Sequence, residues 1–427
     1  WDGRRFVGIR YGLAYTVLGA AYDRIGFGCL HDPLLRDFCI MRLFEPASKI
    51  HSLELMGRYF NIHHGERTLY RRLPLFLSYK TKAENAAISF AHHELKDNLS
   101  VILYDVTTLY FESFDADALR KPGFSKDSKS QQPQIVVGLL VSQDGFPLQQ
   151  ETFPGNTFEG KTMLPIVRAF REAYRTTRCT VVADAAMLSL QNMAALHAES
   201  WTYIVGGRIA NLSPKIINRI VEALKDKRNG ATIRIKTAHG DLICAYSARR
   251  ERKDRADMER GLAKAKALIE RGELGRRAKF VKKEVTEGAY TLNVALQNKT
   301  ERLLGIKGYY TNIPAGEMGD AEVIDRYANL WRVEQSFRMS KSDLVARPIF
   351  HYKEDSVKAH MVMCFIALAM GKYVEHLSGH SLRHIIDLLS QVPDARLAHT
   401  QTRKEIILRS PVHADLLYLL KALGVSH

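Results

Sequence analysis

The spacing of apolar residues predicts a helical region over about the first 98 residues. Leu13 to Tyr22 is mostly apolar, and Asp32 to Phe44 places apolar side chains three and four residues apart, which is the spacing of one helix face. Ser52 to Tyr59 and Glu66 to Leu77 follow, with a short polar break between them. These two segments predict a helix-turn-helix.

The second of these predicted helices carries Arg67, Arg71 and Arg72 near one another. A basic helix face suits the phosphates of DNA, and it equally suits the solvated side of an ordinary helical bundle. The sequence leaves both interpretations open. The histidine pairs at 63–64 and 92–93 are adjacent residues, which point in different directions on a helix, so we expect surface or packing roles for them.

Strands replace helices from about residue 99. Apolar, β-branched runs predict strands at Val101 to Val106, Gln134 to Val141 and Leu148 to Phe153. A helix, a strand, a helix and a strand are then predicted at Thr162 to Arg175, Cys179 to Asp184, Leu188 to Ala198 and Trp201 to Val205. This order predicts an α/β fold with a mixed sheet flanked by helices.

Residues 209–304 interrupt this order. A helix is predicted at Pro214 to Lys225, and alternating patterns predict strands at Ala231 to Lys236, Leu242 to Ser247 and Tyr290 to Leu296. The segment 249–283 has 14 Lys and Arg against six Asp and Glu, so it is net positive. We interpret 209–304 as a β-rich basic insertion.

The pattern of a strand followed by helices resumes after the insertion. A strand is predicted at Lys307 to Ile313, a long helix at about Asp325 to Lys341, and an apolar helix from Ser356. The predicted division is therefore 1–98 (helical, a candidate DNA-binding region), 99–208 and 305–378 (the two parts of the α/β domain), 209–304 (the insertion) and 379–427 (a helical C-terminal region).

Composition and charge point to a polyanionic partner. The 427 residues are 46% hydrophobic and carry 62 Lys and Arg against 46 Asp and Glu, a net charge of +16, which favours nucleic acid. The five cysteines lie far apart, so neither a disulfide framework nor a zinc site is indicated and a reducing cytoplasm is expected. The most apolar stretch, Met361 to Met370, predicts a buried helix rather than a membrane span. The chain begins at Trp1 without an initiator Met, which is expected either of a fragment or of a trimmed chain.

Two acidic residues lie in unusual positions. Asp105 and Asp184 each follow an apolar run that predicts a central strand, where a buried carboxylate is costly unless something compensates its charge. If the two strands are neighbours, the carboxylates converge at one end of the sheet. Two convergent carboxylates are typical of a site for Mg²⁺, which prefers oxygen ligands.

A third acid comes from the predicted helix at 325–341. Tyr327, Glu334 and Lys341 are seven residues apart, so on one continuous helix they share a stripe. Leu330 and Phe337 lie on nearly the same face, which predicts that the stripe faces the protein. The alternative is an ordinary amphipathic helix with Glu334 paired to Arg338.

Five segments together resemble a bacterial insertion-sequence transposase of the DDE type. More narrowly, they are similar to the group with a Tyr-Arg-Glu-Lys signature and a β-rich insertion in a ribonuclease-H-like catalytic domain. The resemblance runs from about Arg42 to Lys372, and the order and spacing of the segments make it specific. The segments are Tyr104 to Glu112, Gly123 to Asp127, Phe153 to Thr162, Val182 to Ser189 and Tyr327 to Lys341.

The resemblance implies that Asp105, Asp184 and Glu334 are the catalytic residues and bind two Mg²⁺ ions, which Mn²⁺ can replace. Tyr327 and Lys341 match the signature's tyrosine and lysine, which contact DNA phosphates in this family. The position of the family's arginine is Leu330 here.

Further DNA contacts are expected around these residues. Arg332 and Arg338 are candidates for the phosphate contact of the missing arginine. Trp331 keeps the family's aromatic position, where base stacking and core packing are both open, and Lys126 in a predicted loop is a further candidate. A solvated turn explains that loop nearly as well.

The implied function is cleavage of insertion-element ends and joining of the 3′-hydroxyl to target DNA. The implied partners are double-stranded DNA with terminal inverted repeats, target DNA and a second copy of the chain on paired ends, in the cytoplasm with the nucleoid. Three alternatives remain: a ribonuclease-H-like nuclease without strand transfer, a truncated end-binding repressor, and an α/β protein whose acids are merely ion-paired.

Overall fold

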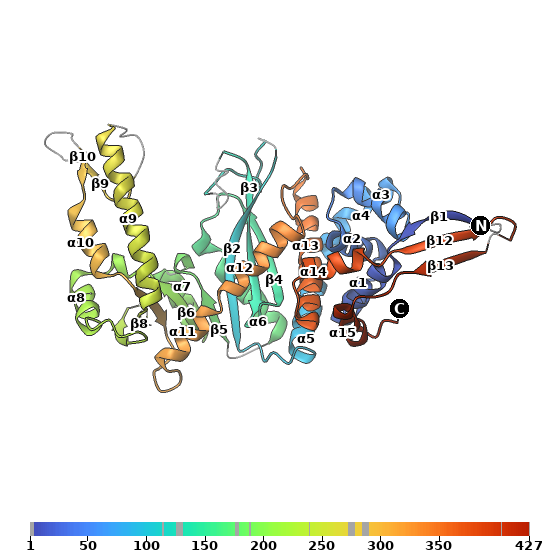
Figure 1. Ribbon diagram of the computed structural model, residues 1–427. Coiled ribbons are helices and arrows are strands. Elements are labelled where there is room, and N and C mark those ends of the chain that lie inside the picture. Colours follow the sequence, from blue (N-terminus) through green and yellow to red (C-terminus); the bar gives the residue numbers. More distant parts are fainter. Residues whose placement is uncertain are drawn as a thin grey trace. The chain divides into compact units, whose positions relative to one another are not determined.

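The computed structural model describes residues 4–112, 115–124, 131–175, 179–187, 189–238, 240–271, 278–283, 290–402 and 404–426. The chain forms two compact units, which Figure 1 shows coloured along the sequence. The first unit comprises residues 1–182 and 329–427, and the second comprises residues 183–328.

The N-terminal part of the first unit is helical, as predicted. Its helices are α1 (Gly12–Ile25), η1 (Phe27–Leu30), α2 (Pro33–Phe44), α3 (Lys49–Phe60), α4 (Glu66–Ser78) and α5 (Lys80–His93). The helices α2 and α3 begin after Asp32 and Ser48, whose side chains accept hydrogen bonds from backbone N–H groups of the first turn, the usual N-cap arrangement. The helices α3 and α4 are the two helices of the predicted helix-turn-helix.

One arginine of the basic face on α4 is tied to the protein. Arg72 donates to the buried carboxylate of Asp32 at 2.6 Å, whereas Arg67 and Arg71 are exposed. Of the predicted packing histidines, His64 is bonded to Asp37 at 2.7 Å, and His92 to the carbonyl of Asp97 at 3.1 Å.

A sheet of antiparallel strands follows these helices. The strands β2 (Val101–Tyr110), β3 (Gln134–Ser142) and β4 (Pro147–Pro154) pair in sequence order, and β5 (Thr180–Ala183) lies on the other side of β2. The turn between β3 and β4 contains Gly145 at φ +86°, a left-handed conformation that favours glycine. β2 is therefore an interior strand.

Helices cover both faces of these strands. One face receives α6 (Met163–Tyr174), which follows η2 (Glu159–Lys161), and the Tyr104 hydroxyl donates to Thr162 at the start of α6 at 2.7 Å. The other face receives α12 (Trp331–Arg338) and α13 (Glu354–Ser378). Between them lies η5 (Met339–Asp343), a π-helical segment. α13 is long and apolar enough to cross a membrane, but 89% of its most apolar window is buried, so the prediction of a buried helix is confirmed.

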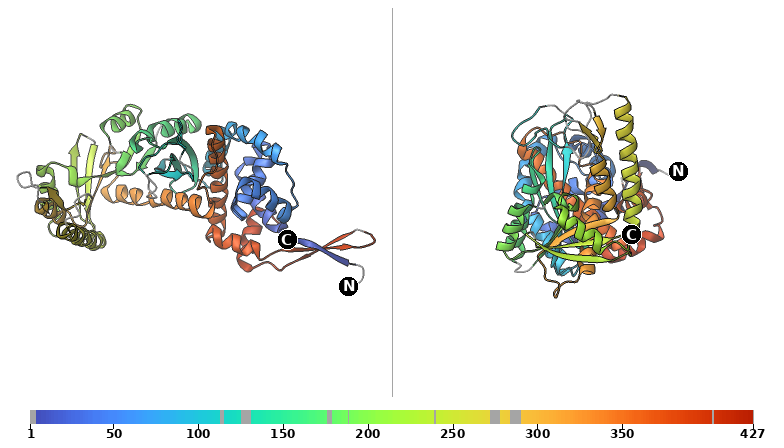
Figure 2. Two further views of the ribbon diagram at one scale, coloured as in Figure 1. Left: turned by 90° about the horizontal axis from the view of Figure 1, so that it is seen from above. Right: turned by 90° about the vertical axis from the view of Figure 1, so that its left-hand side faces the viewer.

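The C-terminal region contains two helices and two strands. The helices are α14 (Leu382–Ser390) and α15 (Ala414–Leu423), and the strands are β12 (Asp394–His399) and β13 (Glu405–Arg409). They form a three-stranded antiparallel sheet with β1 (Arg4–Arg10), which extends from the helices of the first unit (Figure 2). The pattern of the sequence did not predict these three strands.

The second unit carries a further set of antiparallel strands in the order β6-β11-β8-β7. These are β6 (Thr202–Gly207), β7 (Thr232–Thr237), β8 (Gly240–Tyr246) and β11 (Ile306–Thr311), while β9 (Val281–Lys283) and β10 (Tyr290–Leu292) form a separate pair. The helices are η3 (Ala185–Met187), α7 (Leu190–Ala198), η4 (Ile209–Asn211), α8 (Pro214–Ala223), α9 (Ala248–Glu270), α10 (Val294–Arg302) and α11 (Asp320–Ala328).

The predicted α/β fold class is confirmed: strands of a mixed sheet are flanked by helices, and the ends of the chain are largely helical. Two predicted elements are wrong. The strand expected at Tyr290 to Leu296 ends at Leu292, and α10 begins two residues later because the Asn293 side chain caps it through the N–H of Leu296. The helix expected at 325–341 is two helices and a π-helical segment.

The burial of α13 gives a prediction about stability. Phe365 on this helix is 2% exposed, so Phe365→Ala should destabilise the protein by about 3–5 kcal/mol through lost apolar contact and a residual cavity. The control is Phe158→Ala, since that side chain is 64% exposed. Thermal and urea unfolding monitored by circular dichroism would measure both; equal losses of stability would contradict the packing described here.

Candidate active site

Asp105 lies in the middle of β2. Its backbone pairs with Leu139 on β3, and its side chain is half-buried. Because side chains alternate along a strand, Asp105 shares one face of β2 with Thr107 and Leu109. This face is the one that carries the candidate site.

The helix α12 is fixed against this face by hydrogen bonds from its first two turns. The Ser336 hydroxyl donates to the carbonyl of Gly145 at 3.1 Å, and the Arg332 guanidinium donates to the carbonyl of Asp144 at 3.1 Å. Arg332 also lies 3.7 Å from the Asp144 carboxylate. The start of α12 is therefore held at the β3–β4 turn, while its buried residues Val333 and Phe337 pack inward.

The end of α12 reaches the other end of the same face. Phe337, Ser340 and Lys341 surround a small space together with Thr107 and Leu109 of β2. α12 and η5 thus run along β2 in the same direction. In the sequence, Glu334 lies between the residues that make the first and the last of these contacts. The helix that contains Glu334 therefore packs on the face of β2 to which Asp105 belongs.

Glu334 is exposed and has no internal partner. Within the described part of the chain, its carboxylate makes no hydrogen bond or ion pair, and Arg338 is likewise exposed and unpaired. The alternative pairing of Glu334 with Arg338 is therefore wrong. A carboxylate at the edge of a packed helix, with all its lone pairs available, is suited to an external cation.

The predicted stripe of Tyr327, Glu334 and Lys341 does not lie on one helix. α11 ends at Ala328, and α12 begins at Trp331 after a turn in which the N–H of Arg332 bonds to the carbonyl of Asn329 at 2.9 Å. Lys341 lies in the π-helical η5. Because the helix breaks, Tyr327 belongs to the second unit, whereas Glu334 and Lys341 belong to the first.

Asp184 and Tyr327 come together in the second unit. Asp184 directly follows β5, is exposed, and accepts a hydrogen bond from the N–H of Ala185. Tyr327 is buried, and both its hydroxyl and the N–H of Ala185 lie against Gly206 of β6, at 2.6 and 3.1 Å from where a Cβ would stand. The glycine therefore makes room for the tyrosine beside the peptide that follows Asp184.

Two residues that the sequence analysis missed surround Tyr327. The Lys307 ammonium lies 4.2 Å from the centre of the Tyr327 ring, and the Tyr309 ring packs edge-on at 5.0 Å. Lys307 and Tyr309 are two residues apart on β11, and side chains two residues apart on a strand point to the same face. This spacing alone could not show that both side chains contact Tyr327.

The other predicted DNA contacts differ in what they can reach. Trp331 is 52% exposed, so the alternative of core packing is wrong for it, and the Arg332 guanidinium lies 5.4 Å from its ring. The contacts of Arg332 with Asp144 are internal, whereas Arg338 faces solvent. Lys126 lies outside the described residues.

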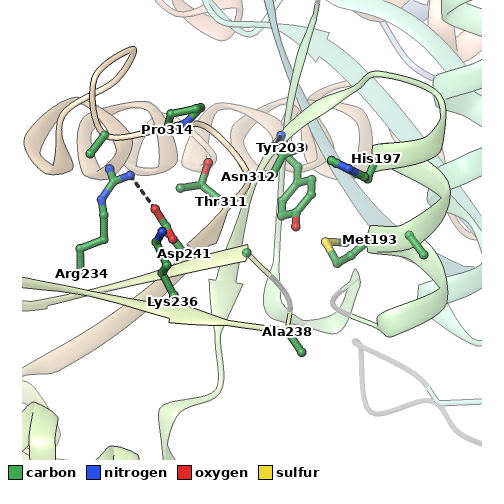
Figure 3. Close-up of a pocket in the computed structure, with 13 residues that line it drawn as sticks. Met193, His197, Tyr203, Arg234, Lys236, Ala238, Asp241, Thr311, Asn312 and Pro314 are labelled. Carbon is green, nitrogen blue, oxygen red and sulfur yellow. Dashed lines mark hydrogen bonds and ion pairs between the residues drawn. The ribbon is translucent and has the colours of Figure 1, made fainter.

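A separate cavity of about 770 Å³ lies in the second unit (Figure 3), lined by side chains such as His197, Tyr203 and Lys236. Arg234 is anchored there by Asp241 at 3.1 Å and Asp320 at 2.8 Å, and it donates to two backbone carbonyls. This arginine therefore holds β7, β8 and the start of α11 together. None of the predicted site residues that the structure describes lines the cavity.

Comparison with protein families supports the DDE part of the resemblance. A family model described as the transposase DDE domain matches residues 97–370. No curated protein matches the chain. Among solved structures, the chain is similar to a piggyBac transposase synaptic complex with hairpin DNA, with 8% identity and a TM-score of 0.44 over 86% of this chain and 70% of that chain.

A second solved structure is a Mos1 transposase paired-end complex with the left transposon end. It has 13% identity and a TM-score of 0.19, over 38% of this chain and 48% of that chain.

The packing of Tyr327 gives a prediction about the second unit. Gly206→Ala would place a methyl group 2.6 Å from the Tyr327 hydroxyl, so we expect a loss of about 1–3 kcal/mol from overpacking. The control is Gly316→Ala, where an added Cβ meets no atom within 4 Å. Urea unfolding of both variants measures the effect, and an unchanged Gly206→Ala protein would disprove this packing.

Proposed function

The chain belongs to the transposase DDE family, and we propose that it cleaves the ends of a bacterial insertion element and joins the freed 3′-hydroxyl to target DNA. The observation that carries the proposal is that α12, which contains Glu334, packs on β2, which contains Asp105. Paired carboxylates on a rigid strand and a rigid helix are what metal-assisted phosphodiester chemistry requires.

The proposed metal ligands are Asp105, Asp184 and Glu334. A divalent ion is expected from the family, and the donor set fits one, because all three side chains offer carboxylate oxygens and Asp184 and Glu334 are exposed to a ligand. β5, which ends next to Asp184, is the strand beside β2. We propose two Mg²⁺ ions, with Mn²⁺ as a substitute; when bound, they would supply activation of the attacking oxygen and stabilisation of the leaving oxygen.

The residues around the acids would position DNA. Lys341, which lies near Thr107 of β2, would neutralise one DNA phosphate. The Tyr327 hydroxyl would donate a hydrogen bond to another phosphate. The exposed Trp331 ring would stack on a base. Arg338 would contact a phosphate from the solvent side of α12. Arg332 and Lys126 are also proposed to contact DNA.

The partners follow from charge and family. A net charge of +16 suits binding along a duplex, where each neutralised phosphate releases counterions. We propose that the DNA partners are an element's terminal inverted repeats and a target duplex, bound by a dimer on paired ends. We propose that the protein is located in the cytoplasm, in association with the nucleoid.

Substitution of the metal ligands tests the chemistry. Asp184→Asn should lower Mg²⁺-dependent cleavage of a duplex carrying the element end by about a hundredfold or more, since losing a metal ligand costs several kcal/mol of transition-state stabilisation. EDTA should abolish the wild-type reaction. The exposed Asp226 of the second unit gives the control Asp226→Asn, and both variants should bind the duplex.

Cleavage by Asp184→Asn at the wild-type rate would exclude the proposed ligand set. Cleavage by the wild type without joining to a target duplex would instead favour a nuclease. Specific binding of the ends without any cleavage in Mg²⁺ or Mn²⁺ would favour a repressor.

The salt dependence of DNA binding tests the role of Lys341. The logarithm of the association constant should fall with the logarithm of salt concentration, and Lys341→Ala should make this slope shallower by about 0.9, the value for one phosphate contact. Lys225→Ala is the control, because that lysine is paired with Glu222 on α8. Identical slopes and cleavage rates for Lys341→Ala and the wild type would remove Lys341 from the interface.

A further inference from the structure

Among the buried cationic residues of the first unit, two line one cavity away from the candidate active site. Arg42 on α2 is 7% exposed, and Lys49, the first residue of α3, is 8% exposed. Charged groups this deeply buried are normally paired with an opposite charge, because an unpaired one loses its hydration without compensation.

Within the described part of the chain, both cations have only neutral hydrogen-bond partners. The Lys49 ammonium donates to Nδ1 of His360 at 3.2 Å and to Nε2 of His351. The other ring nitrogen of His360 faces the carbonyl of Ala346 at 3.2 Å, which assigns the proton to Nε2 and leaves Nδ1 as an acceptor.

Arg42 shows the same pattern. Its guanidinium donates to the backbone carbonyls of Leu344 at 3.1 Å and Val345 at 3.0 Å. Burial, together with the charge of Arg42, lowers the pKa of Lys49 to about 7. The cluster therefore holds two buried cationic groups that no carboxylate of the described residues balances.

A cavity of about 150 Å³ opens between these groups. It is lined by Arg42, Ser48, Lys49, His351 and His360, with Phe350 at its edge, and none of its lining residues is acidic. Ser48 is exposed and Phe350 is 64% exposed, so the cavity is reachable from solvent.

The start of α3 adds to the positive potential. Ser48 caps the helix by accepting from the N–H of His51 at 3.2 Å, which leaves the N–H groups of Lys49 and Ile50 without an intrahelical partner. The N-terminus of a twelve-residue helix is favourable for an anion. Helix, lysine and arginine thus converge on one cavity.

We infer that this cavity binds a phosphate group, held by the Lys49 ammonium, the Arg42 guanidinium and the first N–H groups of α3. A phosphate would balance both buried cations and accept from all three kinds of donor. The source can be inorganic phosphate or a backbone phosphate of DNA; the second rests on the proposed function, whereas the first does not.

Inorganic phosphate tests the cavity independently of DNA. The melting temperature of the wild-type chain should rise with phosphate concentration above its value in chloride of equal ionic strength, because a ligand that binds only the folded state stabilises it. Lys49→Met should keep its melting temperature in chloride, since an apolar residue of similar length replaces a buried charge. Its affinity for phosphate should fall about tenfold or more.

The control is Lys82→Met, which removes an exposed lysine of α5 in the same unit. It should respond to phosphate as the wild type does. Equal phosphate responses of Lys49→Met and Lys82→Met would overturn the inference. Isothermal titration of the wild type with phosphate does not depend on any variant folding, and the lack of saturable binding would also overturn it.

DNA binding distinguishes the two sources. If the phosphate belongs to the DNA backbone, Lys49→Met should bind the duplex about tenfold more weakly and with a shallower salt dependence than Lys82→Met. If duplex binding is unchanged while the phosphate response is lost, the site takes free phosphate. Loss of cleavage in Asp184→Asn is a separate result, so failure of the proposed chemistry would not be mistaken for failure of this site.

Discussion

The packing of α12 on β2 is the contact on which the arrangement of the candidate site depends. β2 lies between β3 and β5, with helices on both faces, so the position of Asp105 is set by the interior of the sheet. Glu334 has no comparable constraint of its own. Its position is set by two hydrogen bonds to the β3–β4 turn, where Gly145 takes the left-handed conformation that lets the backbone carbonyls face α12.

The strands of the α/β region were predictable because their signal is local. Val101 to Val106 and Gln134 to Val141 are continuous β-branched, apolar runs, the pattern of strands buried on both faces. The second run matches β3 to within one residue, whereas the first predicts only the beginning of β2, which continues to Tyr110. For the same reason, Asp105 could be recognised as an acid on a buried strand. The roles of the acids rest on the family resemblance, since no local pattern shows which carboxylates meet.

The elements that were missed depend on distant parts of the chain. β1 pairs with β12, almost 400 residues later, and exposed residues such as Phe6 and Leu408 give no clear sign of which face is buried. The break between α11 and α12 was missed because the seven-residue spacing of Tyr327, Glu334 and Lys341 fits a continuous helix equally well. Only the turn at Asn329 shows that the pattern is divided.

The buried cations connect the helical N-terminal region to the segment that follows the candidate site. The carbonyls that accept from Arg42 belong to Leu344 and Val345, three and four residues after Lys341. A phosphate beside Arg42 and Lys49 would relieve the repulsion between two cations that hold α2 and α3 against this segment. A DNA phosphate, or inorganic phosphate, would then fix the end of η5, in addition to the DNA phosphates that would reach the proposed catalytic acids. Sequence pattern alone could not indicate this, because Arg42 and Lys49 are spaced like ordinary surface residues of two amphipathic helices, and only their burial distinguishes them.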